Sequence, residues 1–135
     1  MADKILLEIV TPEKTVMSEM VDVAVMPGEL GEFGVLAHHI PFLAKLRIGE
    51  LRFRVGNTTR FVTTMGGYAE VLPDRVTVLT PAAEEASNID VIRARAARER
   101  AEQRMRESRD RLAFARTQAA LQRAITRLKV AERRG

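Results

Sequence analysis

The chain has 135 residues, of which 46% are hydrophobic and 30% charged, a composition typical of a folded protein with a modest core. The absence of Cys excludes disulfides, thiolate zinc sites and cysteine nucleophiles, and the scarcity of aromatic residues (4%) disfavours a nucleic-acid platform of stacked rings. Residues 1–86 hold 8 Lys/Arg and 12 Asp/Glu, whereas residues 87–135 hold 14 Lys/Arg and 6 Asp/Glu. This asymmetry predicts two domains, 1–86 and 87–135, with different partners.

The amino terminus gives no sign of export or membrane insertion. Residues 1–4 lack a basic region followed by a long apolar stretch, and the longest uncharged apolar-rich segment, 33–44, is too short to span a bilayer. A cytoplasmic or peripheral protein is therefore expected.

Short β-favouring runs with turn residues between them fill the acidic part of the chain. They cover residues 5–10, 21–26, 51–55, 60–64, 68–71 and 75–80. In the run 51–55, three apolar residues alternate with two arginines, as in a strand with one buried face. The pattern predicts an antiparallel β-sandwich of about 8–10 short strands.

After Pro81 the composition shifts to Ala, Arg, Glu and Gln, which predicts helix from residue 87 onward. Ser87, with Asp90 three residues later, approximates a capping box, so the first helix is expected to start near Asn88. Residues 108–110 are the expected turn, and a second helix is predicted over about 110–131. The resulting antiparallel two-helix hairpin has few large apolar side chains, so it depends on docking and is expected to be mobile.

No catalytic or metal site is predicted. His38 and His39 are adjacent, so in an extended segment their rings point to opposite faces; a loop leading into a strand is the preferred interpretation. Gly28, Gly31 and Gly34 fit neither a dinucleotide-binding nor a phosphate-loop spacing and are interpreted as turn glycines with positive φ.

Two charged features remain. Glu84 and Glu85 are interpreted as a solvated linker. The basic hairpin is either a solvated face or a binding surface for nucleic acid, anionic lipid or an acidic protein. One alternative is thus a nucleic-acid-binding module with the sandwich as its scaffold, which predicts steeply salt-dependent binding of oligonucleotides.

Residues 27–43 (PGELGEFGVLAHHIPFL), with Leu46, Gly49 and residues 66–68 (GGY), closely resemble the sandwich domain of F-type ATP synthase epsilon subunits. The resemblance extends over essentially the whole chain, including residues 9–12 and the Arg/Ala-rich tail. It implies a non-catalytic rotor subunit of the central stalk, which couples proton or sodium flow to ATP synthesis. The implied partners are the gamma subunit and the c-ring, with no nucleic acid, and the implied place is peripheral, on the cytoplasmic face of the membrane.

The resemblance also implies a regulatory hairpin. In the family, the hairpin folds down on the sandwich or rises along gamma into the α/β catalytic head, where it hinders ATP hydrolysis. The family's β subunits present an acidic segment near the rotor. On charge alone, the candidates for contact with it are Arg116, Arg123, Arg127, Lys129, Arg133 and Arg134.

Residues 89–94 (IDVIRA) resemble the I/L-D-x-x-R-A motif with which some bacterial epsilon subunits bind ATP on the folded-down hairpin. The fixed positions are Ile89, Asp90, Arg93 and Ala94, and an ungapped alignment adds Glu84, Arg100, Arg123 and Arg127. The resemblance implies that Asp90 or the backbone near Ala94 reads the adenine edge while arginines hold the phosphates. ATP is thus expected as a regulatory ligand, with no cofactor required. The alternative is that Asp90 merely caps the helix and that Arg93 and Arg100 lie in solvent.

Overall fold

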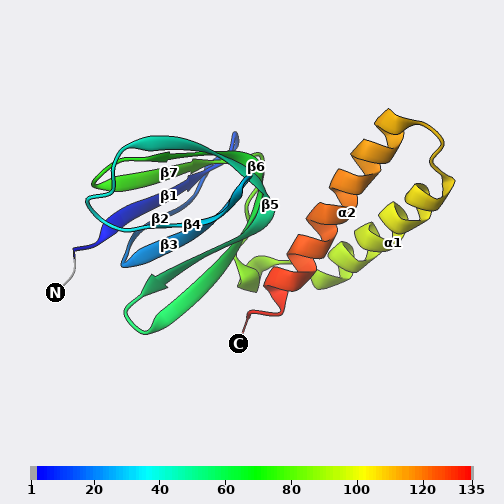
Figure 1. The fold of residues 1–135 in the computed structure, drawn as a ribbon. Coiled ribbons are helices and arrows are strands. Elements are labelled where there is room, and N and C mark those ends of the chain that lie inside the picture. The colour runs from blue at the N-terminus through cyan, green and yellow to red at the C-terminus, as the bar shows by residue number, and fades with distance from the viewer. Residues whose placement is uncertain (1–2, 135) are drawn as a thin grey trace.

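The computed structural model describes residues 3–134 and has two parts, a curved β-sheet folded into a sandwich and a helical hairpin that projects from it (Figure 1). The strands are β1 (Ile5–Val10), β2 (Thr15–Val21), β3 (Val23–Gly28), β4 (Gly31–Val35), β5 (Phe42–Val55), β6 (Thr58–Val71) and β7 (Arg75–Leu79). A short 3-10 turn, η1 (Ala86–Asn88), precedes helices α1 (Val91–Glu107) and α2 (Arg111–Ala131). The predicted fold class, a sandwich followed by a two-helix hairpin, is confirmed.

The predicted number of strands is wrong, because two strands of the described chain are long. β5 and β6 have 14 residues each and pair from Phe42↔Val71 to Val55↔Thr58. The sequence divides β6 at Gly66 and Gly67, but these glycines, with φ of 88° and 100°, bend the strand without ending it. One seven-stranded sheet, in the order β2-β1-β7-β6-β5-β3-β4, therefore supplies both layers of the sandwich.

The pairing is antiparallel except between β1 and β7, which run parallel. Because β1 and β7 are the first and last strands of the sandwich, no tight turn joins them and none imposes the antiparallel direction.

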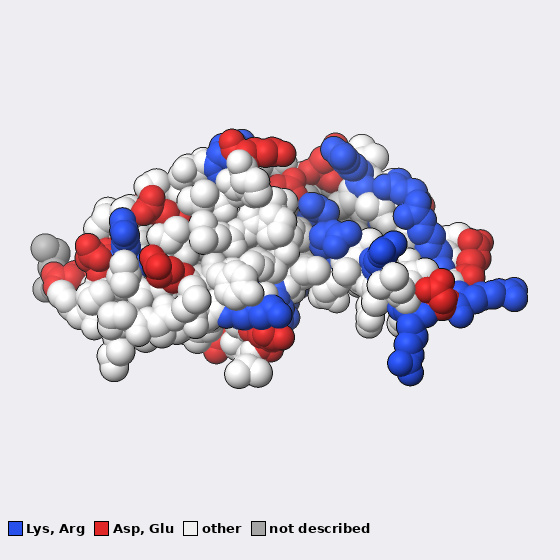
Figure 2. All heavy atoms as spheres, turned by 90° about the horizontal axis from the view of Figure 1, so that it is seen from above, with Lys and Arg blue, Asp and Glu red and all other residues white. Residues whose placement is uncertain are grey.

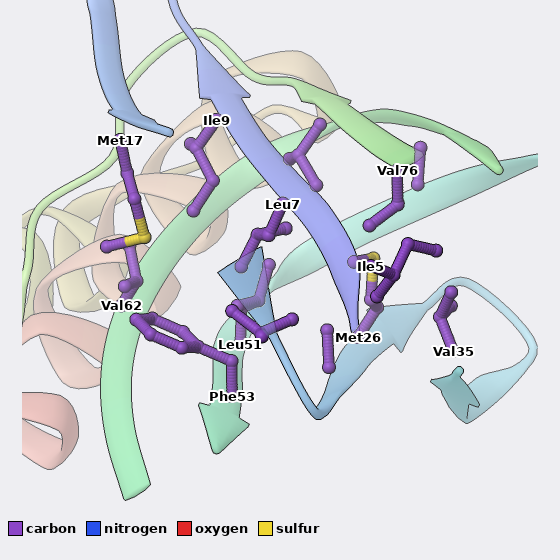
Figure 3. Close-up of a cluster of buried hydrophobic side chains, with 14 of the residues drawn as sticks. Ile5, Leu7, Ile9, Met17, Met26, Val35, Leu51, Phe53, Val62 and Val76 are labelled. Carbon is purple, nitrogen blue, oxygen red and sulfur yellow. The ribbon is translucent and has the colours of Figure 1, made fainter. Parts of the chain in front are cut away.

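The core lies between the two layers and follows the period-2 pattern of the strands. In β1, Ile5, Leu7 and Ile9 are fully buried, while the intervening residues are partly exposed. In β5, Val55, the last of the three predicted inward residues, is only partly buried, whereas Leu51 and Phe53 are buried. Figure 3 shows these side chains converging from β1 and β5.

The glycines of the β3–β4 hairpin have different roles from those predicted. Only Gly31 has the expected positive φ, 137°, after the two-residue turn. The prediction is wrong for Gly28 and Gly34, which lie within β3 and β4. Gly28 is required for another reason, since a Cβ there would lie 2.5 Å from the carbonyl oxygen of Gly31.

The hairpin meets the sandwich mainly through α2. α2 packs on β5, β6 and η1, whereas α1 packs principally on α2, and the loop between the helices points away from the sheet (Figure 1). No helix within residues 3–134 has both the length and the apolar character needed to cross a membrane.

The first helix begins later than predicted. Residues 86–88 form the 3-10 turn, and Asp90, not Ser87, is the N-cap of α1: its Oδ1 accepts a hydrogen bond from the backbone N–H of Arg93 at 3.0 Å. The predicted turn before α2 is correct, with Asp110 as the N-cap.

Candidate functional site

A cleft of about 340 Å³ opens where the linker after β7 meets both helices. Its lining residues are Ala82, Glu84, Asp90, Arg93, Ala94, Ala97, Arg100 and Arg127. The three alanines have side chains too small to fill the space. Three guanidinium groups and two carboxylates line the cleft, so its net charge is positive.

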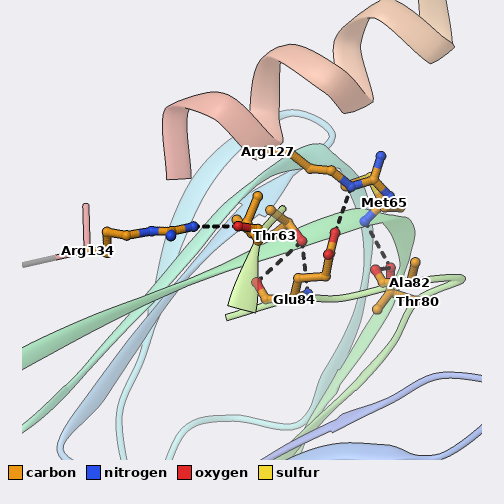
Figure 4. Close-up of polar contacts among 8 residues, drawn as sticks. Thr63, Met65, Thr80, Ala82, Glu84, Arg127 and Arg134 are labelled. Carbon is orange, nitrogen blue, oxygen red and sulfur yellow. Dashed lines mark hydrogen bonds and ion pairs between the residues drawn. The ribbon is translucent and has the colours of Figure 1, made fainter. Parts of the chain in front are cut away.

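Hydrogen bonds to β6 fix the linker side of this cleft (Figure 4). The backbone N–H of Thr63 donates to the carbonyl oxygen of Glu84 at 2.9 Å, and the N–H of Glu84 donates to Oγ1 of Thr63 at 3.0 Å. Upstream, buried Thr80 accepts a hydrogen bond from the N–H of Met65 at 3.0 Å and donates to the carbonyl oxygen of Ala82 at 3.2 Å. The segment between sheet and helix is therefore held in place along most of its length.

Both linker carboxylates have arginine partners, so the interpretation of Glu84 and Glu85 as solvated is wrong. Nε of Arg127 in α2 donates to Glu84 Oε1 at 2.6 Å. Arg60 in β6 donates to both oxygens of Glu85, at 2.8 and 2.9 Å. These hydrogen bonds, which Glu85 accepts, are the main cause of a raised pKa of Arg60; Glu19 also raises this pKa, and burial opposes the rise.

The helix side of the cleft presents cations. Arg93 and Arg100 are seven residues apart and so lie on the same face of α1, with Ala97 between them. Both are exposed, and neither side chain has a hydrogen bond or ion pair among residues 3–134. Two guanidinium groups with free donors are an arrangement suited to phosphate groups, which they bind in a bidentate manner.

Six of the eight residues predicted for ATP line this cleft: Glu84, Asp90, Arg93, Ala94, Arg100 and Arg127. Ile89 does not, because it is buried against Ala86, Val130 and Ala131. Arg123 is half-buried on α2 outside the lining. The sequence missed Ala97, which helical spacing from Arg93 indicates, and Ala82, for which no signal exists.

The six residues predicted for contact with an acidic partner are not equivalent. Arg116 and Lys129 are exposed and Arg123 is half-buried. Arg127, Arg133 and Arg134 instead make hydrogen bonds to Glu84, Glu50 and the backbone of Ile89. Figure 2 shows the contrast in surface charge: Lys and Arg gather over the hairpin, while both signs are mixed on the sandwich.

A second, apolar groove of about 590 Å³ lies between the β3–β4 hairpin and the start of β5. Leu30, at the tip of that hairpin, is fully exposed, and Leu43 is 68% exposed. His39 also lines this groove, in the predicted loop before β5. Among residues 3–134 no group of three or more His, Cys, Asp or Glu side chains is placed to hold a metal ion.

Family models match both parts of the chain. The model for the β-sandwich domain of the ATP synthase delta/epsilon chain matches residues 4–86, and the model for the long α-helix domain of the same chain matches residues 87–132.

Proteins similar to this chain over more than nine tenths of its length are ATP synthase epsilon chains. One from Syntrophobacter fumaroxidans is 72% identical over 133 residues, covering 98% of this chain and 99% of that protein. One from Nitratidesulfovibrio vulgaris is 52% identical over 124 residues, covering 92% of each.

Two solved structures have a similar fold. A chain of the Euglena gracilis mitochondrial ATP synthase superposes with a TM-score of 0.80 and 25% identity, covering 96% of this chain and 81% of that one. A chain from the Tetrahymena thermophila mitochondrial ATP synthase has a TM-score of 0.60 and 17% identity, covering 97% and 96%, and is a likeness of fold alone. The family models and the bacterial relatives confirm the resemblance that the sequence indicates, and the chain belongs to the family of ATP synthase delta/epsilon chains.

Proposed function

We propose that this chain acts as the epsilon subunit of an F-type ATP synthase, a rotor subunit of the central stalk. The observation that carries the proposal is the match along the whole chain, at 72% identity over 133 residues, to an epsilon chain with the same two parts. In this role the subunit turns with the rotor that couples ion flow to ATP synthesis, and it performs no turnover of its own.

The apolar groove beside β5 is the proposed contact surface of the sandwich within the rotor. Exposed leucines grouped on one patch, as Leu30 and Leu43 are, mark a protein contact site more often than a free surface. The proposed partners of the sandwich are the gamma subunit and the c-ring, which places the chain peripherally on the cytoplasmic face. The Euglena structure that resembles this chain is an assembly with F1 and the c-ring.

Purification from membranes tests this assignment. A tagged chain should bring the other ATP synthase subunits with it. The double variant Leu30→Asp/Leu43→Asp should lose them, whereas Leu36→Asp, at an exposed leucine outside the groove, should retain them. Recovery of nucleic acid in place of synthase subunits, with steeply salt-dependent oligonucleotide binding, would refute the assignment.

The cleft at the base of the hairpin is the proposed site of a regulatory ATP molecule. Arg93 and Arg100 supply free donors for phosphate oxygens. Asp90 uses Oδ1 for the helix cap, which leaves Oδ2 to accept a hydrogen bond from the adenine amino group. The cleft volume, about 340 Å³, lies within the range of small-molecule sites.

Such a ligand would stabilise the docked hairpin, because the cleft is lined by the linker, α1 and α2 and is complete only while the hairpin is docked. At a ligand concentration 100 times Kd the stabilisation is about 2.7 kcal/mol. A fall in ATP would then release hairpins to reach the α/β catalytic head.

Calorimetric titration of the isolated chain with ATP tests the site. We expect Arg93→Met and Arg100→Met to weaken binding about tenfold or more each, as loss of a charge-assisted contact does. Arg95→Met is the matched control, since Arg95 is exposed on the same helix but does not line the cleft. No heat with the unaltered chain, or equal losses in all three variants, would contradict the proposal.

A further inference from the structure

Three arginines at the carboxyl end of the hairpin fasten it to the rest of the chain. Nε of Arg127 donates to Glu84 Oε1 at 2.6 Å, and Nε of Arg133 donates to Glu50 Oε2 at 3.1 Å. Nη2 of Arg134 donates to the backbone oxygen of Ile89 at 2.6 Å. Figure 4 shows Arg127 and Arg134 reaching from the end of the hairpin toward the linker.

Glu50 is the most telling of the partners, because its side chain is only 8% exposed. It lies in a small cavity between β5 and α2, beneath Thr126 and Lys129. Docking of α2 covers this carboxylate, which is costly unless a cation pairs with it, and Arg133 supplies that cation in the docked state. The guanidinium of Arg133 also lies 5.2 Å from the ring centroid of Phe61, which adds a cation–π contact.

The apolar part of the same interface is small. Its buried cluster consists of Ala86, Ile89, Val130 and Ala131, with Phe61 and Val91 beside it. Two of the four buried side chains are single methyl groups, so apolar burial alone gives the docked state little advantage. The far end of the hairpin adds no apolar burial to this interface, since it points away from the sheet (Figure 1).

We propose that Arg127, Arg133 and Arg134 form a latch that sets the equilibrium between the docked and the undocked hairpin. Charge alone groups these residues with Arg116 and Lys129 as a surface for an acidic partner. The structure divides that group, because the latch arginines make hydrogen bonds to the sandwich and linker, whereas the side chains of Arg116 and Lys129 make no hydrogen bond or ion pair among residues 3–134. Removing a latch arginine should release the hairpin, whereas removing Arg116, which has no such hydrogen bond, should not.

The latch is a property of the isolated chain, and only its consequence for ATP hydrolysis rests on the proposed function. Arg133 is the residue of choice for a test, because Arg127 also lines the ATP cleft and Arg133 does not.

The chain has no cysteine, so a single introduced thiol reports undocking by its rate of chemical labelling. Val130→Cys places the thiol on the fully buried face of α2 at the docking interface, and labelling requires the hairpin to leave. Val76→Cys, fully buried in β7, places a thiol that reports unfolding of the sandwich instead.

In the Val130→Cys background we expect Arg133→Met to accelerate labelling about five- to tenfold, as removal of one partner of a half-buried pair implies. Glu50→Gln should do the same, and the double variant should be less than additive because both changes break one contact. Arg116→Met is the matched control and should label at the rate of the unaltered chain. Added salt should accelerate labelling of the unaltered chain more than that of Arg133→Met.

Two results would overturn the latch. One is labelling of Arg133→Met at the same rate as Arg116→Met. The other is equal acceleration in the Val130→Cys and Val76→Cys backgrounds, which would mean that the pair stabilises the sandwich as a whole. In a reconstituted ATPase, Arg133→Met should strengthen inhibition; no inhibition by any form of the chain would count against the proposed function and leave the labelling result intact.

Discussion

Replacing Arg60 with Met should remove one attachment of the linker to the sandwich and cost about 1–2 kcal/mol of the free energy of unfolding. Arg60 donates to Glu19 Oε2 in β2 at 2.6 Å and to both oxygens of Glu85 in the linker, and it lies 5.0 Å from the ring centroid of Phe53.

The magnitude follows from the exposure of the groups. The side chains of Arg60, Glu19 and Glu85 are 36%, 34% and 25% exposed, so water screens both ion pairs. Each pair then contributes at most about 1 kcal/mol, and the cation–π contact about 0.5–1 kcal/mol. Met keeps much of the apolar stem, so the loss is that of the charge and its hydrogen bonds.

Urea unfolding followed by circular dichroism measures this loss, with Arg75→Met as the matched control. Arg75 is exposed on β7, and its side chain has no hydrogen bond or ion pair among residues 3–134. A double-mutant cycle of Arg60→Met with Glu85→Gln should give a coupling energy of about 0.5–1 kcal/mol. The reasoning is refuted if Arg60→Met costs no more than Arg75→Met, or if the coupling energy is zero.

The Arg60–Glu85 pair also predicts how stability depends on pH. Glu85 raises the pKa of Arg60 above the ordinary value for arginine. A group whose pKa is higher in the folded chain than in the unfolded chain stabilises the fold fully at any pH below its unfolded-state pKa. It loses that contribution only as the pH rises through its folded-state pKa. Both values lie far above neutrality, so the stability difference between Arg60→Met and the unaltered chain should stay constant from neutral to mildly alkaline pH.

Two further pairs of substitutions test the bend in β6 and the start of α1. Gly67→Ala should destabilise the sandwich by about 3 kcal/mol in thermal unfolding, because φ is 100° and a Cβ would collide with the carbonyl oxygen of Leu79. Gly34→Ala, where nothing lies within 4 Å of the new Cβ, should change stability by less than about 1 kcal/mol, and equal effects would contradict this account. Asp90→Ala should cost α1 about 1 kcal/mol, measured by hydrogen exchange of its first turn, while Ser87→Ala should cost nothing; the reverse order would restore Ser87 as the cap.

Elements with strong local signals could be predicted from the sequence. β1 is a run of β-favouring residues that ends just before Thr11 and Pro12, and the start of α2 follows Asp110, whose carboxylate forms the cap. β2 (TVMSEMV) and β4 (GEFGV) were missed, because they are short edge strands rich in polar residues or glycine, and pairing with β1 and β3 decides their structure. α1 begins late because Ser87 and Asp90 are both good caps, and local sequence does not choose between them.

The candidate site divides in the same way. Residues on one helical segment, such as Arg93 and Ala94, came from a contiguous motif and lie together in the cleft. The partner of Glu84 is Arg127, 43 residues away, and that of Glu50 is Arg133, 83 residues away. Such pairs depend on how the hairpin docks, which no periodicity within a helix specifies. Charge alone therefore placed latch residues and free residues in one group.

The attachment of the hairpin at its base makes it a lever. α2 has 21 residues and is therefore about 31 Å long. A rotation of about 10° at the base then carries the far end of the helix through about 5 Å. Leu112 and Phe114, exposed at that far end, would travel the full distance while Val130 hardly moves. The arginine contacts lie at the base of the hairpin. A small rotation there, when these contacts form or break, therefore displaces the far end of the helix far enough to gain or lose a whole contact surface.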